Sequence, residues 1–187
     1  MKPRNHVLLA TQWQFCNSYW GMVFTPGDFM TPDPGGYIKR PSFYVYELYA
    51  QHFGDRLLPA QVQCGNFSLQ ADTPIYDLGQ GVARLPDSTP IPLLSVNASK
   101  KEKTGTVYLM VVNKSMDQDI RCRVSLDGFS GTPSAVARVL DGPSIESVNE
   151  PGKEPVGIKQ SGVFFNGGSC EMTFPAHSFT ALEVNNG

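Results

Sequence analysis

Apolar and aromatic residues between residues 42 and 53 recur every three to four positions, which is the spacing of one face of an α-helix. The stripe is aromatic and wide, so it must lie against another apolar surface; it consists of Phe43, Tyr46, Tyr49 and Phe53. Ser42 is a residue type that caps the start of a helix, and Gly54 is one that ends a helix in a left-handed conformation. The pattern therefore predicts a helix over residues 42–53.

After residue 58 apolar positions alternate with polar ones, which is the period of a strand with one buried face. In residues 118–126, for example, Ile120, Cys122 and Val124 face inward if the arginines between them face water. Turn sequences separate such segments every 8–12 residues or so, which predicts a mainly β chain built as an antiparallel β-sandwich, jelly-roll-like in its many short strands. Strands are expected at residues 62–64, 94–98, 105–113 (central, apolar on both faces), 118–126, 134–140, 155–160, 161–166, 169–174 and 178–184.

The first part of the chain has a different organisation. Residues 6–15 are apolar at first and polar-aromatic at the end, which suits a strand buried on both faces, as in a parallel barrel. Residues 16–41 are rich in Gly, Pro, Asp and aromatic residues and predict a long loop. We therefore divide the chain into a strand–loop–helix unit at residues 1–57 and a β-sandwich at residues 58–187.

Composition and charge narrow the classes of function. The chain has 187 residues, of which 41% are hydrophobic and 17% charged, as expected of a protein with a real core. Its formal net charge is −2 and it has no basic stripe, so nucleic acid and anionic membranes are poor partners. The N-terminal apolar run is too short for a signal peptide, and no segment reaches the roughly 18 apolar residues of a transmembrane helix. We expect a soluble chain, and its compartment is undetermined.

The four cysteines form neither a zinc-binding nor a redox motif. Cys16, Cys64, Cys122 and Cys170 are far apart along the chain, without the close pairs that such sites need. Cys64 and Cys122 occupy apolar positions of strand-like segments, so we expect buried free thiols, and a disulfide only if the protein is secreted. No metal site and no cofactor motif is predicted.

Six segments, by their order and spacing, resemble the C-terminal end of the arabinofuranosidases of glycoside hydrolase family 51. They are Ala10–Phe15, Pro41–Tyr49, His52–Arg56, Pro92–Val96, Tyr108–Asn113 and Phe174–Phe179. The resemblance spans nearly the whole chain. It implies that the strand–loop–helix unit is a remnant of a (β/α)8 barrel, its last βα unit, and that the remainder is the sandwich that follows the barrel.

The resemblance also implies where the catalytic residues are. Members of the family are retaining enzymes that use two Glu residues on earlier strands of the barrel. Retaining hydrolysis needs two carboxyl groups about 5–5.5 Å apart across the scissile bond. The strands that would hold them are absent here, so the sequence is expected to begin inside a domain and to contain no catalytic residue. We predict that this chain alone is inactive.

Three polar residues imitate catalytic ones. Glu150 lies in Asn149-Glu-Pro151, a tripeptide that carries the acid/base in several barrel glycosidases, but here it falls between predicted sandwich strands. We expect it to lie in a solvated loop. Glu47, in the predicted helix, is expected to be a surface charge. His177 has no nucleophile elbow and no triad partner at a telling spacing, and is expected to be a satisfied polar residue before the last strand.

Trp13, Gln14 and Trp20 are the candidate substrate-binding residues. The first two lie at the end of the predicted barrel strand, where such barrels collect binding residues, and Trp20 follows in the loop. An indole can stack on the CH face of a sugar while a carboxamide bonds two hydroxyl groups. The three residues could then be the remnant of a subsite of the parent enzyme. The alternative is that Trp13 packs under the loop and Trp20 is partly buried.

We therefore predict the C-terminal accessory sandwich of an α-L-arabinofuranosidase, whose parent enzyme acts on arabinoxylan or arabinan. The alternative is a free-standing carbohydrate-binding module, which would need two or three coplanar exposed aromatic residues; Tyr37, Tyr76 and the loop tryptophans are the candidates. The barrel strand and the aromatic helix have lost their neighbours and would expose an apolar patch. We therefore expect a homo-oligomer, or an N-terminal segment that lies across the sandwich.

Overall fold

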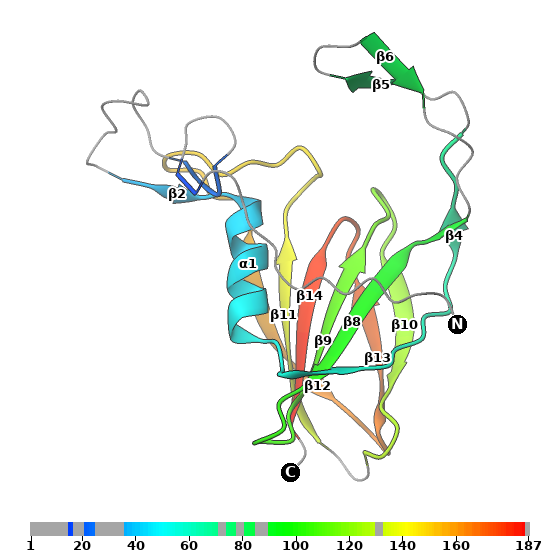
Figure 1. Cartoon of the computed structure of the whole chain (residues 1–187). Helices are drawn as coiled ribbons and strands as arrows, with labels where there is room; N and C mark the ends of the chain where they lie inside the picture. Colours follow the sequence, from blue (N-terminus) through cyan, green and yellow to red (C-terminus); the bar gives the residue numbers. More distant parts are fainter. Residues whose placement is uncertain are drawn as a thin grey trace.

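Six strands form the main sheet of this computed structural model, which describes residues 15–16, 21–24, 36–70, 74–77, 81–84, 90–129 and 133–185, with residues 74–77 and 81–84 described by their backbone alone. Every neighbouring pair in this sheet is antiparallel. The strand predicted as central, β9, lies between β14 and β8 (Figure 1). In order across the sheet the strands are β12 (Gly157–Phe164), β11 (Ser134–Asp141), β14 (Phe179–Asn185), β9 (Val107–Asn113), β8 (Leu94–Lys100) and β3 (Arg56–Leu58).

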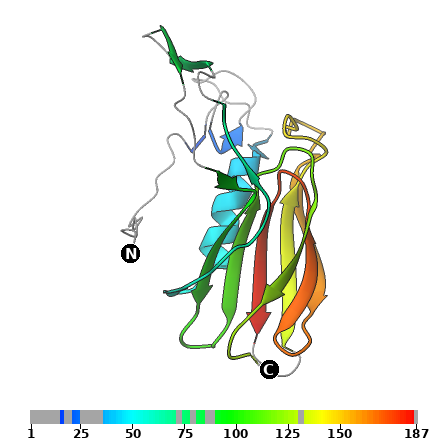
Figure 2. The same cartoon turned by 90° about the vertical axis from the view of Figure 1, so that its right-hand side faces the viewer.

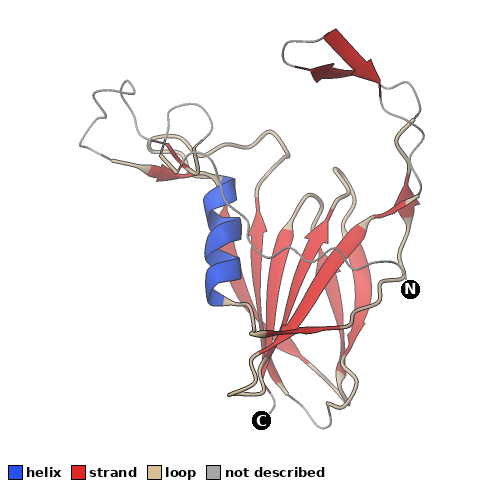
Figure 3. Cartoon of the chain, viewed as in Figure 1, coloured by secondary structure: helices blue, strands red, loops and turns tan. Residues whose placement is uncertain are grey.

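A second, smaller layer covers one face of this sheet. It consists of the antiparallel pair β10 (Ile120–Ser125) and β13 (Ser169–Phe174). The core between the layers joins Phe174 of β13 to Leu109, Val111 and Leu182 of the larger sheet. The predicted mainly β architecture of antiparallel strands is confirmed, with one short helix among the described residues (Figure 3).

Three short ladders lie outside the two layers. Each is an antiparallel pair: β1 (Val23–Phe24) with β2 (Ile38–Lys39), β4 (Asn66–Phe67) with β7 (Ile91–Pro92), and β5 (Pro74–Asp77) with β6 (Gly81–Arg84). The first ladder lies within the predicted loop and leads directly into the helix. The first nine residues of the predicted barrel strand, and most of the loop that follows, lie outside the described residues.

Helix α1 (Pro41–Gln51) packs on the opposite face of the large sheet (Figure 2). Leu48 is 1% exposed and contacts a cluster that includes Met110, whose neighbours Leu109 and Val111 face the other core. The ring of Tyr49 lies 5.4 Å from that of Phe179, centroid to centroid. The expectation that this helix would expose its apolar stripe is therefore wrong only in part: Tyr49 and Phe53 pack against the sheet, whereas Tyr46 of the predicted stripe is exposed. The sequence pattern showed that a cover was needed but not which element supplies it.

The helix begins and ends differently from the prediction. Arg40 is the residue before the helix and Pro41 occupies its first turn, so Ser42 lies inside the helix and is not its cap. Proline suits that position because its missing N–H has no helical partner there. The helix ends at Gln51. Gly54 does not have the positive φ of a left-handed helix end. A Cβ on Gly54 would overlap the main-chain carbonyl of Lys100, so glycine is needed there for close approach.

Two strand predictions need correction. Residues 155–160 and 161–166 form one strand, β12, and not two. Its exposed polar run from Lys159 to Gly162 is tolerated because β12 is an edge strand, with β11 on one side only. Residues 62–64 form no strand, although Val62 and Cys64 do pack against the core. β3 spans the proposed division at residue 57 and pairs with β8; the division itself stays a prediction.

All four cysteines are free thiols, but Cys64 and Cys122, which were expected to be buried, are buried only in part. Cys170 is buried between the layers, whereas Cys16 is exposed and Cys64 and Cys122 are half-buried. Burial, with smaller contributions from Glu171 and Cys122, raises the pKa of the Cys170 thiol to about 11. Burial also raises the pKa of Cys122. These thiols behave as small apolar core groups.

Candidate functional site

The three candidate sugar-binding residues, Trp13, Gln14 and Trp20, lie outside the described residues. Phe15, which follows Gln14 in the sequence, is described, and its ring lies 6.2 Å from that of Phe43 in the first turn of α1, centroid to centroid. The carbonyl oxygen of Phe15 accepts a hydrogen bond from the main-chain N–H of Val23 at 2.9 Å. The end of the predicted barrel strand is therefore joined to β1 and to the start of the helix.

Glu150 lies on an exposed turn, as predicted. Its main-chain N–H and carbonyl oxygen both bond to Lys153, each at 2.9 Å, and this pair closes the turn. Its side chain lines neither of the two grooves described below. Glu47 differs from the prediction: it is half-buried and forms an ion pair with Lys39 at 3.1 Å. Each glutamate thus has a structural explanation.

Within the Asn-Glu-Pro tripeptide, Asn149 has a structural role that was not predicted. Its side chain is buried, with 4% of the residue exposed. Its Nδ2 donates to the carbonyl oxygens of Lys39 and Val156 at 3.0 and 2.8 Å, and its Oδ1 accepts from the N–H of Val156 at 2.9 Å. Asn149 therefore ties the loop after β11 to β2, just before the helix.

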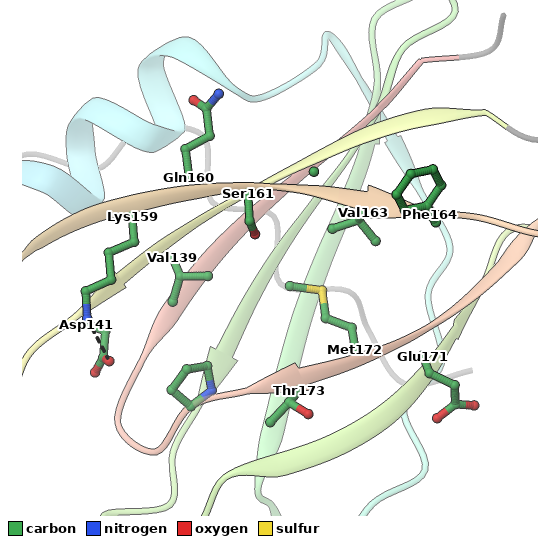
Figure 4. Close-up of a pocket in the computed structure, with 12 residues that line it drawn as sticks. Val139, Asp141, Lys159, Gln160, Ser161, Val163, Phe164, Glu171, Met172 and Thr173 are labelled. Carbon is green, nitrogen blue, oxygen red and sulfur yellow. Dashed lines mark ion pairs between the residues drawn. The ribbon is translucent and has the colours of Figure 1, made fainter.

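The first groove, about 520 Å³ in volume, lies at the open edge of the sandwich between β12 and β13. Figure 4 shows Ser161 and Val163 of β12 and Met172 of β13 pointing toward one another across it. The ring of Phe164, 95% exposed, points away from β13. An exposed aromatic residue thus borders this groove, but it does not form a platform inside it.

The carboxylates of this first groove do not form a catalytic pair. Asp141 and Glu171 are the two that line it, and they lie at opposite ends of the view in Figure 4. Asp141 is 3.9 Å from the ammonium group of Lys159, and Glu171 is 3.5 Å from the guanidinium group of Arg121. Both carboxylates are therefore engaged by cations.

The second groove, about 470 Å³ in volume, separates α1 from the loop that follows β11. Its walls are mostly apolar, and its polar end contains Asp141, Ser178 and His177. Asp141 is its one carboxylate among the described residues. His177 lies 3.8 Å from Asp141, and both of its ring nitrogens face main-chain carbonyl oxygens, those of Met116 and Gly142. His177 is thus a hydrogen-bonded residue before β14, as predicted.

A third polar cluster lies where the helix ends on the sheet. Glu183 accepts a hydrogen bond from Arg138 at 3.0 Å and lies 3.2 Å from Nδ1 of His52. Burial and then the charge of Arg138 lower the pKa of His52, and these effects outweigh the opposing effect of Glu183. His52 is therefore favoured as a neutral ring that orients the helix end on the sheet.

In the part of the chain that the structure describes, no group of three His, Cys, Asp or Glu side chains is arranged to hold a metal ion. No helix there is long and apolar enough to cross a membrane.

Several known proteins are similar to this chain in sequence or in fold. Residues 9–178 match the family model described as the α-L-arabinofuranosidase C-terminal domain. An intracellular exo-α-L-arabinofuranosidase of Bacteroides ovatus is 24% identical over 98% of this chain and 31% of its own length. A probable α-L-arabinofuranosidase C of Aspergillus clavatus is 29% identical over 79% of this chain and 26% of its own. This chain therefore spans about a third or less of the relatives that it matches.

Solved structures agree on the fold. An α-L-arabinofuranosidase of Thermotoga maritima, solved with arabinose, superposes with a TM-score of 0.76 at 20% identity, over 92% of this chain and 33% of that one. The family 51 enzyme of Thermotoga petrophila superposes with a TM-score of 0.75, again at 20% identity over 92% of this chain and 33% of that one. Because the family model covers nearly the whole chain, this protein belongs to the α-L-arabinofuranosidase C-terminal domain family of glycoside hydrolase family 51, as its sequence predicted.

Proposed function

We propose that this chain is the accessory C-terminal β-sandwich of an α-L-arabinofuranosidase and is not catalytic alone. In the whole enzyme it would support hydrolysis of arabinose-containing polysaccharides such as arabinoxylan or arabinan. The relatives named above are arabinofuranosidases, and about two thirds or more of each lies outside the region that this chain matches. That remaining part is where we place the catalytic barrel.

The observation that carries the proposal is the way α1 is held on the sheet. The helix shares a buried cluster with β9, β11 and β14, and its Leu48 is almost fully enclosed. Asn149 and the cluster around Glu183 add polar contacts at the two ends of the helix. A helix held in this way would fix the orientation of whatever barrel precedes it, which is the task of a supporting domain.

The carboxylates of the described residues are consistent with a supporting role. A retaining mechanism needs a pair about 5–5.5 Å apart that can flank a glycosidic bond. Glu150 lies on an exposed turn, Glu183 is held by Arg138 and His52, and the two carboxylates of the first groove lie far apart along it. We therefore assign no catalytic residue to this chain.

Hydrolysis of an aryl α-L-arabinofuranoside tests the first half of the proposal. The purified chain should release no aryl alcohol above a protein-free control, while the Bacteroides ovatus relative serves as the positive control. Turnover that disappears in Glu150→Gln would mean that the chain has its own active site.

A chimera tests the second half. This chain would replace the matching C-terminal region of the Bacteroides ovatus enzyme, and the comparison would be that enzyme truncated before the same region. We expect the chimera to recover activity that the truncated enzyme lacks, and Leu48→Ala in the chimera to reduce its thermal stability. A folded chimera without activity would contradict the supporting role.

Trp13, Gln14 and Trp20 remain our proposed sugar contacts in the whole enzyme. The rival function, a free-standing carbohydrate-binding module, is favoured by one observation: Tyr37 is 75% exposed. Affinity electrophoresis in gels that contain arabinoxylan distinguishes the two. Retardation of the isolated chain that Tyr37→Ala abolishes would favour the binding module, whereas unretarded migration favours the accessory domain.

A further inference from the structure

β12 is an open edge of the large sheet. It is a long strand, Gly157–Phe164, and it pairs with β11 residue for residue along its whole length. In the part of the chain that the structure describes, no strand pairs with its other side. Main-chain N–H and carbonyl groups alternate in direction along a strand, so about half of those in β12 point away from β11 and can bond another strand.

The opposite edge of the same sheet is protected. β3 has three residues, and Arg56 at its start donates a hydrogen bond to Glu102 at 2.9 Å. Short edge strands and charged side chains are two ways in which natural sheets avoid pairing with other chains. β12 is long and contains no proline, and its one charged residue, Lys159, has its ammonium group 3.9 Å from Asp141. Of the two edges, β12 is therefore the one that can accept another strand.

β12 also ends in an aromatic residue that lies in solvent. Phe164 is 95% exposed. It lies on the same side of β12 as Gln160, whereas Ser161 and Val163 point to the other side, toward β13 (Figure 4). Ile158 packs against the cluster beneath α1 and is separated from Phe164 by an even number of positions, so both lie on the helix side of the sheet. Phe164 thus presents nearly all of its ring at the edge of that face.

We propose that a second copy of this chain pairs with β12, strand to strand, so that the two large sheets join into one. Two antiparallel copies of one strand are related by a two-fold axis perpendicular to the sheet, which keeps each face of the joined sheet continuous. Such an axis passes between one residue and its own copy. We place it at Ser161, which then lies opposite the partner's Ser161.

This register makes the best use of the side chains, and it pairs residues 158–164 of each copy. Phe164 lies opposite the partner's Ile158, an aromatic and β-branched pair of the kind that stabilises antiparallel strands. Lys159 lies opposite the partner's Val163, so the two lysines are four residues, or roughly 13 Å, apart along the strands. That separation exceeds the screening length at physiological salt. A centre one residue nearer the start of β12 would leave Phe164 with no opposite residue in the partner's strand.

The pairing closes on itself and gives a dimer. Each copy uses its β12 once, and the short, charged edge at β3 does not extend the joined sheet. The homo-oligomer that the sequence led us to expect would then form through β12, and not through the N-terminal strand and the helix. The grooves between β12 and β13 of the two copies would lie on the same face of the joined sheet, because the axis preserves its faces.

Sedimentation velocity at micromolar concentrations tests the dimer, with circular dichroism to check that each variant folds. The wild-type chain should be a dimer. Ser161→Lys sets two like charges directly opposite each other and should weaken the dimer by about tenfold or more. Phe164→Ala removes two cross-strand pairs at once, because the axis repeats each change, and should weaken it about tenfold. Leu57→Ala is the matched control at the β3 edge, where the residue is 64% exposed, and should leave the dimer unchanged.

A monomeric wild type would overturn the proposal. A dimer that Ser161→Lys and Phe164→Ala leave intact would overturn it too, because the copies would then meet through another surface.

Disulfide trapping tests the register and does not depend on the weakened variants. In a Cys16→Ser background, which removes the exposed native thiol, Ser161→Cys should form an intermolecular disulfide on mild oxidation. Residues directly opposite each other in an antiparallel pair are close enough for that bond. Gly157→Cys is the control, because its own copy would lie roughly 27 Å away along the strands. No disulfide in Ser161→Cys, or equal trapping at both positions, would contradict this pairing.

Discussion

The side-chain amide of Asn149 donates a hydrogen bond to the main-chain carbonyl oxygen of Lys39 at 3.0 Å, across 110 positions of the sequence. This contact joins the loop after β11 to the strand that leads into α1. The neighbouring Glu150 is exposed, so two adjacent residues of one catalytic-looking tripeptide have opposite environments.

Asn149→Ala should therefore destabilise the chain far more than Glu150→Ala. The first substitution removes three hydrogen bonds and takes the Asn149 side chain away from the main-chain groups of Lys39 and Val156 that it bonds. We expect a cost of about 2–4 kcal/mol. The second changes an exposed side chain and should alter stability by less than about 0.5 kcal/mol. Urea denaturation of both variants measures the difference. Equal losses would show that the Asn149 contacts contribute little.

Gly54→Ala should destabilise the chain although the substitution adds a single methyl group. That methyl group would overlap the main-chain carbonyl of Lys100, which cannot move without disturbing the pair β3–β8. We expect a loss of roughly 1–3 kcal/mol, typical of overpacking. Gly162→Ala is the matched control, because nothing lies within 4 Å of the added Cβ. Thermal unfolding of the two variants should differ by several degrees, and coincident transitions would contradict the close approach.

Leu48→Ala should lower the free energy of unfolding by about 2–5 kcal/mol, because it creates a cavity between α1 and the sheet. Tyr46→Ala, on the exposed side of the same helix, should cost much less. Near-ultraviolet circular dichroism and denaturation curves would report both effects. If Leu48→Ala were no worse than Tyr46→Ala, the helix would not be held on the sheet as described.

The thiols should react in the order of their exposure. With a pKa of about 11, Cys170 has almost no thiolate at pH 8, and it is also buried, so it should resist a thiol reagent until the chain unfolds. Cys16 is exposed and should react first. Mass spectrometry after a short pulse of iodoacetamide identifies the modified positions. Early modification of Cys170 would mean that the two layers open readily.

Much of the sandwich followed from the alternation of apolar and polar residues. The strands around Leu109, Cys122 and Leu182 were predicted within a residue or two. Polar neighbours mark the faces of the strand around Cys122, whereas the strand around Leu109 was recognised as a short run that is apolar on both faces. The edge strand β12 was harder, since its exposed middle carries no such alternation. For the candidate site, the sequence predicted residue types suited to sugar binding but not their arrangement in space. The roles of Trp13, Gln14 and Trp20 stay predictions.

The sequence by itself determined the element types, the family and the need to cover the aromatic helix, because periodicity and residue type are local properties of the chain. Tertiary structure alone decided what covers that helix, why Gly54 must be glycine and why Asn149 is buried. Each of these depends on atoms that are distant in sequence, such as the carbonyl groups of Lys100 and Lys39, and local patterns carry no record of such contacts. The same holds for His177, whose two carbonyl partners are brought together only when β9, β11 and β14 assemble into one sheet.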